Sequence, residues 1–378
     1  MGLISWSVFV GILASILYMT ARVKEFEMNE VKLAPPRPLT GRLAATSKNT
    51  LKSVDRLFEG QLVAPECQLF HKGALYSTSM AGPIVKIVDG KIVKSLEIFK
   101  HNPKCRSHGC SIPLGIRHWK EETFVFADAK LGIFTVDFKT ETFKHIFHAS
   151  TVIGDWSNTF ADDFDFVAND SIIFSDMAPK CGLSGYMLCA LEWSRDGRLI
   201  KVNLNTGAYE IVADKLISPN GVISHPDKQS VIVASTSASE LIRVYNAGPK
   251  KGKVEVFADG LPGLPDNLRA TSSGKTFWVA FYCSTVNGRL FTQWFAEYPS
   301  IRKYLAYYSE YLFALDTYTS SKHVIFIEMD FEGNVVSSYH DLEGRLKEMT
   351  NIIDDEKYFY FGSASQNCIR RALKPRVK

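Results

Sequence analysis

The sequence has few cysteines, little net charge and no serine-hydrolase motif. Seven cysteines in 378 residues are too few for a disulfide scaffold, and their odd number leaves at least one cysteine unpaired in a monomer. The net charge is +4, with lysine and arginine scattered along the chain, so nucleic acid is not an expected partner. Because no G-x-S-x-G segment occurs, serine-centred catalysis has no support.

One long apolar run stands at the amino end. Leu3–Met19 is uncharged and rich in Ile, Leu, Val and Phe, and its length is just enough to cross a bilayer. No basic residue precedes the run, and the residues that follow Met19 form a poor cleavage site. We therefore expect a retained transmembrane signal anchor over residues 1–24, with a cleaved signal peptide as the alternative. Residues 25–55 are polar and proline-containing, and we expect them to form a stalk.

Which side of the membrane the rest of the chain faces stays open from these residues. Arg22 and Lys24 follow the apolar run, and by the positive-inside rule they place the domain in the cytosol. Asn169 begins an N-x-S glycosylation sequon, and Cys105 and Cys110 are close in sequence; both features favour an oxidising lumen.

Cysteine spacing allows two uses near residue 105. The expected one is a Cys105–Cys110 disulfide, and the alternative is a zinc site that includes two nearby histidines, for which the spacing is crowded. The remaining cysteines are expected to be free and buried: Cys67, Cys181, Cys189, Cys283 and Cys368.

From Leu57 onward the chain resolves into short strands separated by turns. One strand type recurs six times, an apolar or aromatic run that ends in a small residue, and most copies are followed by alternating strands. This order predicts an all-β fold, a six-bladed β-propeller over residues 56–375; a β-sandwich would not repeat it. The six segments are 75–78, 124–128, 172–176, 231–235, 277–281 and 359–363.

An insertion at residues 288–315 lengthens the fifth unit. It is dense in tyrosine, phenylalanine and tryptophan, with Pro299 in its middle, and it predicts two short amphipathic helices. These helices are expected to pack on the propeller as a cap. The alternative is a surface that rests on lipid or covers the mouth of the channel.

Four strand entrances share one device, a proline followed by a polar or glycine residue and then an apolar strand. Proline fixes φ and cannot donate to a strand ladder, so it marks the start of a strand. The four are 65–67, 113–117, 219–222 and 265–269. In a propeller the innermost strands begin near the central channel, so their polar residues converge. The residues expected at the channel mouth are Glu66, Asp162, Asn220, Asp266 and Asn267.

These five mouth residues are all hard oxygen donors. Two carboxylates about 5 Å apart repel by roughly 3 kcal/mol at an effective dielectric constant near 20, and a divalent cation removes that repulsion. Five or more oxygens suit Ca²⁺ better than Mg²⁺, and the lack of Cys and His argues against zinc. Any one of these residues alone is explained by a turn, but five in a shared register predict a calcium site.

The chain resembles the strictosidine synthase-like proteins from about Arg56 to Leu373. The resemblance implies a six-bladed propeller on a single-pass signal anchor, with the propeller in the lumen of the endoplasmic reticulum or outside the cell. Related paraoxonases and gluconolactonases bind Ca²⁺ in the channel and hydrolyse lactones or aryl esters. The segments that carry the resemblance are 57–66, 113–117, 219–222 and 261–269.

The resemblance also assigns roles to single positions. Asp162 stands where the relatives have asparagine, and Asp128 occupies the position of a paraoxonase dyad histidine, which makes it an expected substrate-pocket residue. Thr350 and Asn351 replace the region that supplies the catalytic glutamate of strictosidine synthase, so its condensation reaction is not expected. The residues that match calcium ligands of the wider superfamily are Glu66, Asn220, Asp266 and Asn267.

Two functions follow as hypotheses. The first is a Ca²⁺-dependent esterase or lactonase that acts on a small-molecule ester, with Asp266 as general base. The second is a non-catalytic, membrane-tethered propeller in which calcium only holds the blades together, because a fold does not establish a chemistry.

Overall fold

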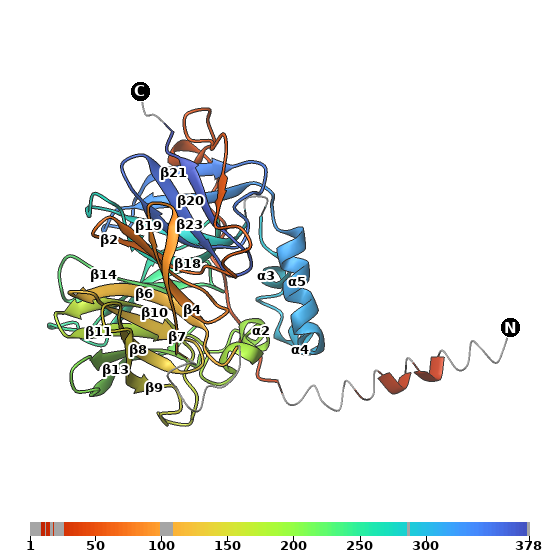
Figure 1. Cartoon of the computed structure of the whole chain (residues 1–378). Coiled ribbons are helices and arrows are strands. Elements are labelled where there is room, and N and C mark those ends of the chain that lie inside the picture. The colour runs from red at the N-terminus through yellow and green to blue at the C-terminus, as the bar shows by residue number, and fades with distance from the viewer. Residues whose placement is uncertain are drawn as a thin grey trace.

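Six four-stranded antiparallel sheets form the body of the molecule (Figure 1). The computed structural model describes residues 9–11, 13–15, 18, 26–98, 109–285 and 288–375. The innermost strands β2, β6, β10, β14, β18 and β22 contact one another in that order, and β22 contacts β2 again. The sheets are therefore the blades of a closed ring, and the predicted six-bladed propeller is confirmed.

The strands follow one another along the chain, four to a blade. Blade one is β2 (Gln68–His71), β3 (Ala74–Thr78), β4 (Pro83–Val88) and β5 (Lys91–Glu97); blade two is β6 (Pro113–Lys120), β7 (Thr123–Asp128), β8 (Gly132–Asp137) and β9 (Thr142–His148); blade three is β10 (Ala161–Ala168), β11 (Ser171–Asp176), β12 (Gly197–Asn203) and β13 (Tyr209–Leu216); blade four is β14 (Pro219–Ser224), β15 (Ser230–Ser235), β16 (Glu240–Tyr245) and β17 (Val254–Ala258); blade five is β18 (Gly263–Ala270), β19 (Phe277–Ser284), β20 (Val324–Met329) and β21 (Val335–Asp341); blade six is β22 (Met349–Asp354), β23 (Tyr358–Ser363), β24 (Ile369–Leu373) and β1 (Asp55–Leu57).

The ring is closed by its two ends. β1 pairs antiparallel with β24, with Arg56 opposite Arg370, so the first strand of the chain completes the last blade. The pairing ties the start of the chain to its end by backbone hydrogen bonds, so the ring is held closed, and the strand edges that remain are short.

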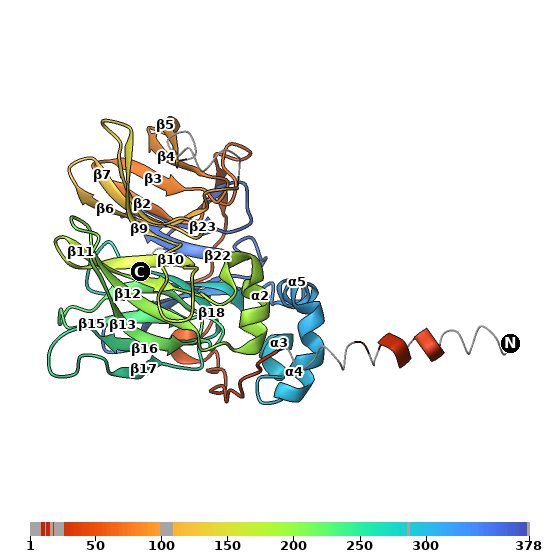
Figure 2. The same ribbon diagram turned by 90° about the horizontal axis from the view of Figure 1, so that it is seen from below.

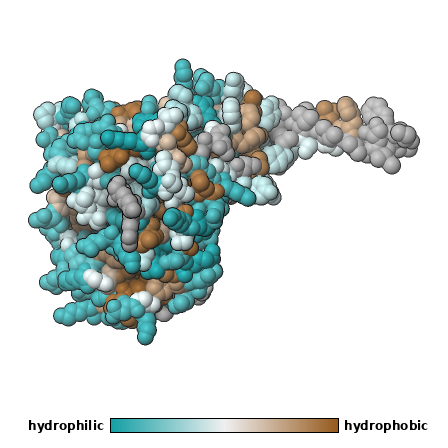
Figure 3. Space-filling model, turned by 90° about the horizontal axis from the view of Figure 1, so that it is seen from above, coloured by the Kyte–Doolittle hydropathy of each residue, from teal (hydrophilic) through white to brown (hydrophobic). Residues whose placement is uncertain are grey.

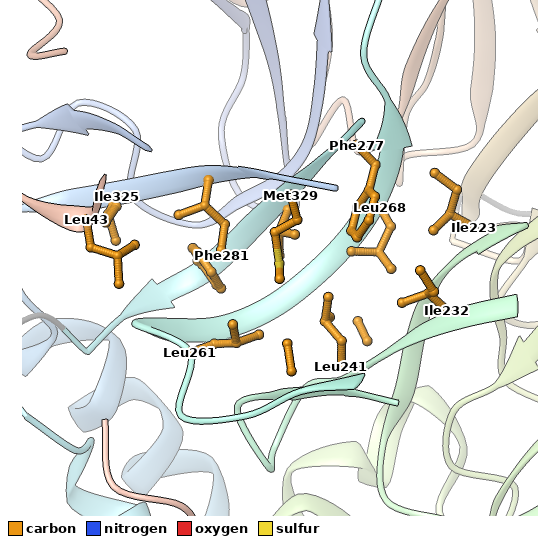
Figure 4. Packing of buried hydrophobic residues seen from close by; sticks show 14 residues of the cluster. Leu43, Ile223, Ile232, Leu241, Leu261, Leu268, Phe277, Phe281, Ile325 and Met329 are labelled. Carbon is orange, nitrogen blue, oxygen red and sulfur yellow. The ribbon is translucent and has the colours of Figure 1, made fainter. Parts of the chain in front are cut away.

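The recurring apolar segments are the second strands of the blades. β3 and β15 are buried at every position, whereas the outer strands β5 and β17 alternate between buried or half-buried and exposed residues. A strand covered on both faces reads as a continuous apolar run, and a half-covered strand alternates. Figure 4 shows such packing between blades four and five, where Ile232 and Leu241 face Leu268, Phe277 and further residues of one buried cluster.

Helices cover one side of the ring (Figure 2). The insertion in blade five forms α3 (Phe291–Trp294), α4 (Pro299–Leu305), the 3₁₀ turn η4 (Ala306–Tyr308) and α5 (Ser309–Thr319). We call residues 291–319 the cap. It holds three helices where two were expected, and it ends at Thr319 instead of residue 315. A further helix, α2 (Gly182–Glu192), was not predicted; it interrupts blade three and contacts α4 and α5.

Residues 26–54 run along the propeller and do not stand clear of it as a free stalk would. Val31 and Leu33 are buried beside Trp193 and Ala296, and the amide of Arg37 donates to the carbonyl of Gly260 at 2.7 Å. Further along, the short turn η2 (Gly41–Leu43) packs on blade five. Most of the expected anchor, residues 1–24, lies outside the described residues. Within the described part of the chain, no helix is both long enough and apolar enough to cross a membrane.

Candidate calcium site and substrate cavity

The proline device corresponds to a bulge in the innermost strand of the blade. In five blades the register of the innermost strand shifts near its start, so that two residues of this strand oppose one residue of the next strand. The shifts lie at 113–116, 161–164, 219–222, 265–268 and 349–352. In blade one, Glu66 precedes β2, and the amide of Thr78 donates to the carbonyl of Cys67. The bulge turns the side chains after each strand entrance toward the channel.

Glycine in these bulges lets neighbouring blades meet at their backbones. A Cβ atom on Gly221 would lie 2.3 Å from the carbonyl oxygen of Asp266 and 2.7 Å from Cα of Asn267. A Cβ on Gly115 would lie 2.5 Å from Oδ1 of Asp163. The mouth residues therefore depend on glycine in the adjacent blade for their position.

Replacing Gly221 with alanine is expected to destabilise the protein by about 2–4 kcal/mol, because two blade backbones must separate to admit one methyl group. Denaturant unfolding of the purified chain measures the change. Gly154→Ala is the matched control: no atom lies within 4 Å of its Cβ position and only its φ of +60° is strained, so a loss of about 1 kcal/mol is expected. Equal losses at the two positions would contradict the role of close blade contact.

All five predicted mouth residues come together. Glu66, Asp162, Asn220 and Asp266, from blades one, three, four and five, line one cavity of about 320 Å³. Asn267 adjoins it and donates from Nδ2 to Oε1 of Glu66. Every one of these side chains is buried. Segments up to about two hundred residues apart in the sequence therefore meet at the channel mouth.

The three carboxylic acids at the channel mouth have raised pKa values. Burial raises the pKa of Glu66 to about 7, although Arg269 and the Asn267 amide oppose the rise. Burial also raises the pKa of Asp162 and of Asp266 well above the ordinary value, and the neighbouring carboxylates raise both further. Three acids that repel one another in a buried place are stable together only when protons or a cation compensate them.

Two oxygen atoms in the cavity lack partners. Oε2 of Glu66 and Oδ1 of Asn220 are buried without a hydrogen bond, as is Oδ1 of nearby Asn351. Unsatisfied buried acceptors are rare in folded proteins and point to a bound ion or water. In the described chain no three His, Cys, Asp or Glu side chains are grouped closely enough to bind a metal by themselves. The donor set that fits an ion is therefore mixed, with carboxylate and amide oxygens, and this chemistry suits Ca²⁺.

Below the mouth lies a buried ion pair that the sequence reasoning missed. Oδ2 and Oδ1 of Asp163 accept hydrogen bonds from Arg269 at 2.7 and 3.0 Å, and Arg117 lies 3.3 Å from Oδ1. Burial favours the neutral acid, but the two guanidinium groups outweigh it and lower the pKa of Asp163. The backbone amide of Val222 also donates to Oδ2 at 3.1 Å. One carboxylate thus joins blades two, three, four and five.

Asp128 does not line the cavity. Its carboxylate accepts hydrogen bonds from the Ser111 hydroxyl and from the amides of Ile112, Lys130 and Leu131, at 2.5 to 3.0 Å. These contacts hold two loops of blade two together, which is a structural use of the position expected to be a substrate-pocket residue. No histidine is found among the described residues that line the cavity.

The outer wall of the cavity is helical and mostly apolar. α2 contributes Leu183, Tyr186 and Met187, and α5 contributes Leu312 and Asp316. Burial raises the pKa of Tyr186, so its phenol stays protonated. α2 and the cap therefore cover the mouth of the channel. Covering the mouth was part of the alternative stated for the insertion.

The disulfide pairing corrects the expectation that Cys181 and Cys189 are free. The expected Cys105–Cys110 pair includes a residue outside the described part of the chain. Cys181 and Cys189 form a disulfide across α2, where both were expected to be free. Cys110 is disulfide-bonded, but its expected partner Cys105 lies outside the described residues. Among the described cysteines, Cys67, Cys283 and Cys368 are free and buried, as expected. Asn169 is exposed in the turn between β10 and β11.

The sequence of the chain is similar to that of known proteins. The sequence model of the strictosidine synthase family matches residues 162–249. The adipocyte plasma membrane-associated protein of Danio rerio is 30% identical over 347 residues, covering 89% of this chain and 80% of the relative. The human protein of that name is 30% identical over 344 residues, covering 87% and 81%.

Solved structures share the fold at low sequence identity. A calcium-binding protein, regucalcin, from Agrobacterium tumefaciens aligns with a TM-score of 0.55 at 14% identity, covering 87% of this chain and 97% of that protein. A gluconolactonase from Xanthomonas campestris gives a TM-score of 0.55 at 13% identity, covering 91% and 96%.

Proposed function

The chain belongs to the adipocyte plasma membrane-associated protein family, and from that premise we propose that it is a membrane-anchored, calcium-dependent esterase or lactonase of small ester substrates. The observation that carries the proposal is the pair of partnerless oxygens, Glu66 Oε2 and Asn220 Oδ1, beside two further acids in one cavity. The names of the relatives, which place them at the plasma membrane, support a membrane location, and we propose that the propeller is lumenal or extracellular.

Calcium would be held by Glu66, Asn220 and Asp266, with Asp162 and Asn267 beside them. Bound there, it would supply a Lewis acid for an ester carbonyl and compensate the charge of the acids. A calcium-binding relative with the same fold supports this assignment. Asp162 adds a negative charge to the set, so we expect tight binding that weakens when Asp162 becomes asparagine.

Catalysis would depend on the walls and acids of the chain itself. The apolar residues of α2 and the cap exclude water from the acyl group, which strengthens electrostatic interactions at the channel mouth. Asp266 lines the cavity, and its carboxylate, held beside the cation, would be the group that takes a proton from attacking water. Tyr186, protonated and facing the same space, is placed to donate a hydrogen bond to the substrate.

Ester turnover by the purified full chain tests the proposal. We expect hydrolysis within a panel of aryl esters and lactones, lost in chelator, and a fall in kcat/KM of about a hundredfold or more in Asp266→Asn. Asp259→Asn is the matched control, because this carboxylate is 57% exposed on the propeller surface and should leave turnover unchanged. Unchanged turnover in Asp266→Asn would remove the general base from the mechanism.

A non-catalytic role is favoured by one observation, the lack of histidine among the described cavity residues. In that case the propeller is a membrane-tethered interaction module, and calcium only holds the blades together. The same experiment separates the two functions. Calcium binding without turnover across the whole panel would assign the module.

A further inference from the structure

The cap carries an unusual concentration of exposed aromatic side chains. Beyond residue 25, nine aromatic residues of the described chain are exposed, and seven of them lie in the cap. Tyr311 and Tyr318 are 77% and 85% exposed, and Trp294 is 61% exposed. The seven are Phe291, Trp294, Tyr298, Tyr304, Tyr308, Tyr311 and Tyr318. Large exposed apolar groups gathered in one place mark an interaction surface.

These side chains form stripes on the outer faces of the helices. In α5, Tyr311, Leu315 and Tyr318 follow the i, i+4, i+7 spacing of one helix face, and all three are exposed. Leu312 and Asp316, four residues apart on another face, line the cavity instead. One helix therefore presents an aromatic stripe outward and closes the substrate cavity inward.

Arg302 joins the cap to the segment around Met28 and Asn29. Its buried guanidinium donates to the carbonyls of Leu191 at 2.7 Å and Ala296 at 3.0 Å, and also to the carbonyl of Asn29. The segment that leads to the amino-terminal apolar run is thus held against the cap and α2. Figures 1 and 2 show α2, α3, α4 and α5 together on one side of the molecule, and Figure 3 shows apolar residues, in brown, among the polar ones on the surface.

Chain length limits how far the cap can stand from a membrane. Met28, beside Arg302, comes nine positions after Met19, the end of the apolar run, and these nine steps span at most about 30 Å when fully extended. If the run lies in a bilayer, the tether holds the cap near the lipid headgroups. Tyrosine and tryptophan are the residues that favour that interface, because their rings are apolar and their tips are polar.

We propose that the aromatic face of the cap rests on the bilayer surface, as a second membrane contact beside the amino-terminal run. Continuity with that run favours lipid over a protein partner, since a tethered cap meets lipid before it meets any other molecule. Resting on the proposed function, the same geometry makes the substrate a lipophilic ester that enters from the bilayer between α2 and α5.

A site-specific label tests the contact in the full chain reconstituted into lipid nanodiscs. An environment-sensitive dye is attached at Tyr311→Cys or Tyr318→Cys, and at Val93→Cys as the matched control, a 53% exposed position on β5. The free cysteines of the described chain are buried, and the labelled wild-type chain gives the background. We expect lipid-borne quenchers to reduce emission at 311 and 318 about threefold more than at 93.

Two results would overturn the proposal. One is equal quenching at all three positions. The other is a dye at 311 that is shielded from water only at high protein concentration and without lipid quenching, because then a second copy of the chain covers the face.

Ester turnover tests the substrate class separately. Changing Trp294, Tyr311 and Tyr318 together to serine should lower hydrolysis of a long-chain ester in vesicles about tenfold and leave a short soluble ester unaffected. Loss of both activities would remove the bilayer entry route. If no ester is hydrolysed by the unmodified chain, the proposed function fails, while the quenching result still decides the membrane contact.

Discussion

Replacing Asp163 with asparagine should cost about 3–5 kcal/mol of folding free energy, the largest loss expected from any single substitution in the channel. The carboxylate is fully buried, and the Arg269 and Arg117 side chains are only 6% and 15% exposed. Without the negative charge, the buried Arg269 guanidinium loses its carboxylate partner, and Arg117 keeps only Asp165, 3.9 Å away. Chemical denaturation in chelator measures the loss.

Neutralising Asp162, the residue before Asp163, is expected to change the folding stability in the opposite direction. Asp162 faces Glu66 and Asp266, with no basic side chain bonded to it among the described residues, so neutralising it removes repulsion. In chelator, Asp162→Asn should therefore stabilise the folded chain. The two substitutions make the same chemical change at adjacent positions of one bulge. If both destabilise the chain equally in chelator, the distinction between the repelling mouth acids and the ion-paired Asp163 below them is wrong.

A double-mutant cycle separates the ion pair from local damage. Replacing Arg269 with methionine alone should also be costly, but the combination with Asp163→Asn should cost less than the sum, because the buried Arg269 charge is removed together with the carboxylate that compensated it, and Arg117 keeps Asp165. A fully additive result would assign the loss at Asp163 to its hydrogen bond with the amide of Val222.

Strand entrances were predictable because proline has one backbone behaviour. Pro113 and Pro219 begin β6 and β14 in the structure, and Pro265 lies within the bulge of β18. The same offset placed the mouth residues, including Asp162, whose blade lacks the proline. A local constraint repeated at a regular spacing therefore identified side chains that four blades bring to one cavity.

Contacts made only after closure of the ring could not be predicted in this way. Arg117 and Arg269 each come soon after a bulge in the sequence, but nothing local shows that both reach Asp163. The helix α2 gave no usable signal either, since no side chain caps its amino end and Gly185 lies within it. The pairing of Cys181 with Cys189 was missed for the same reason, because connectivity depends on that unrecognised helix.

Calcium should stabilise the chain far more at pH 7.5 than at pH 5. In chelator, the folded state holds protons on Glu66, Asp162 and Asp266 that the unfolded state has already lost, so stability falls as the pH rises. For Glu66 the fall runs from about pH 4.5 to about 7 and amounts to on the order of 3 kcal/mol. Calcium binds the deprotonated acids, and at a hundred times its dissociation constant it returns about 2.7 kcal/mol.

The difference between the pH profiles of stability with calcium and with chelator reports only on the acids of the channel mouth. Other buried acids, such as Asp176 and Glu240 with pKa values raised to about 6 and about 7, also lower stability as pH rises, but in both profiles alike. His145 and His340, with pKa values lowered by burial to about 4, lower it equally toward acid pH. Thermal unfolding with calcium and with chelator from pH 5 to 8 therefore yields a curve in which these terms cancel.

Glu66→Gln supplies the decisive variant, because it keeps the shape of the side chain and removes one titrating group. In calcium the substitution should lower the melting temperature at pH 7.5. In chelator it should leave the melting temperature unchanged or raise it, since a buried charge has been deleted. Equal losses in both conditions would show that Glu66 acts only through its bond to Asn267, and the partnerless Oε2 would then need an explanation other than a cation.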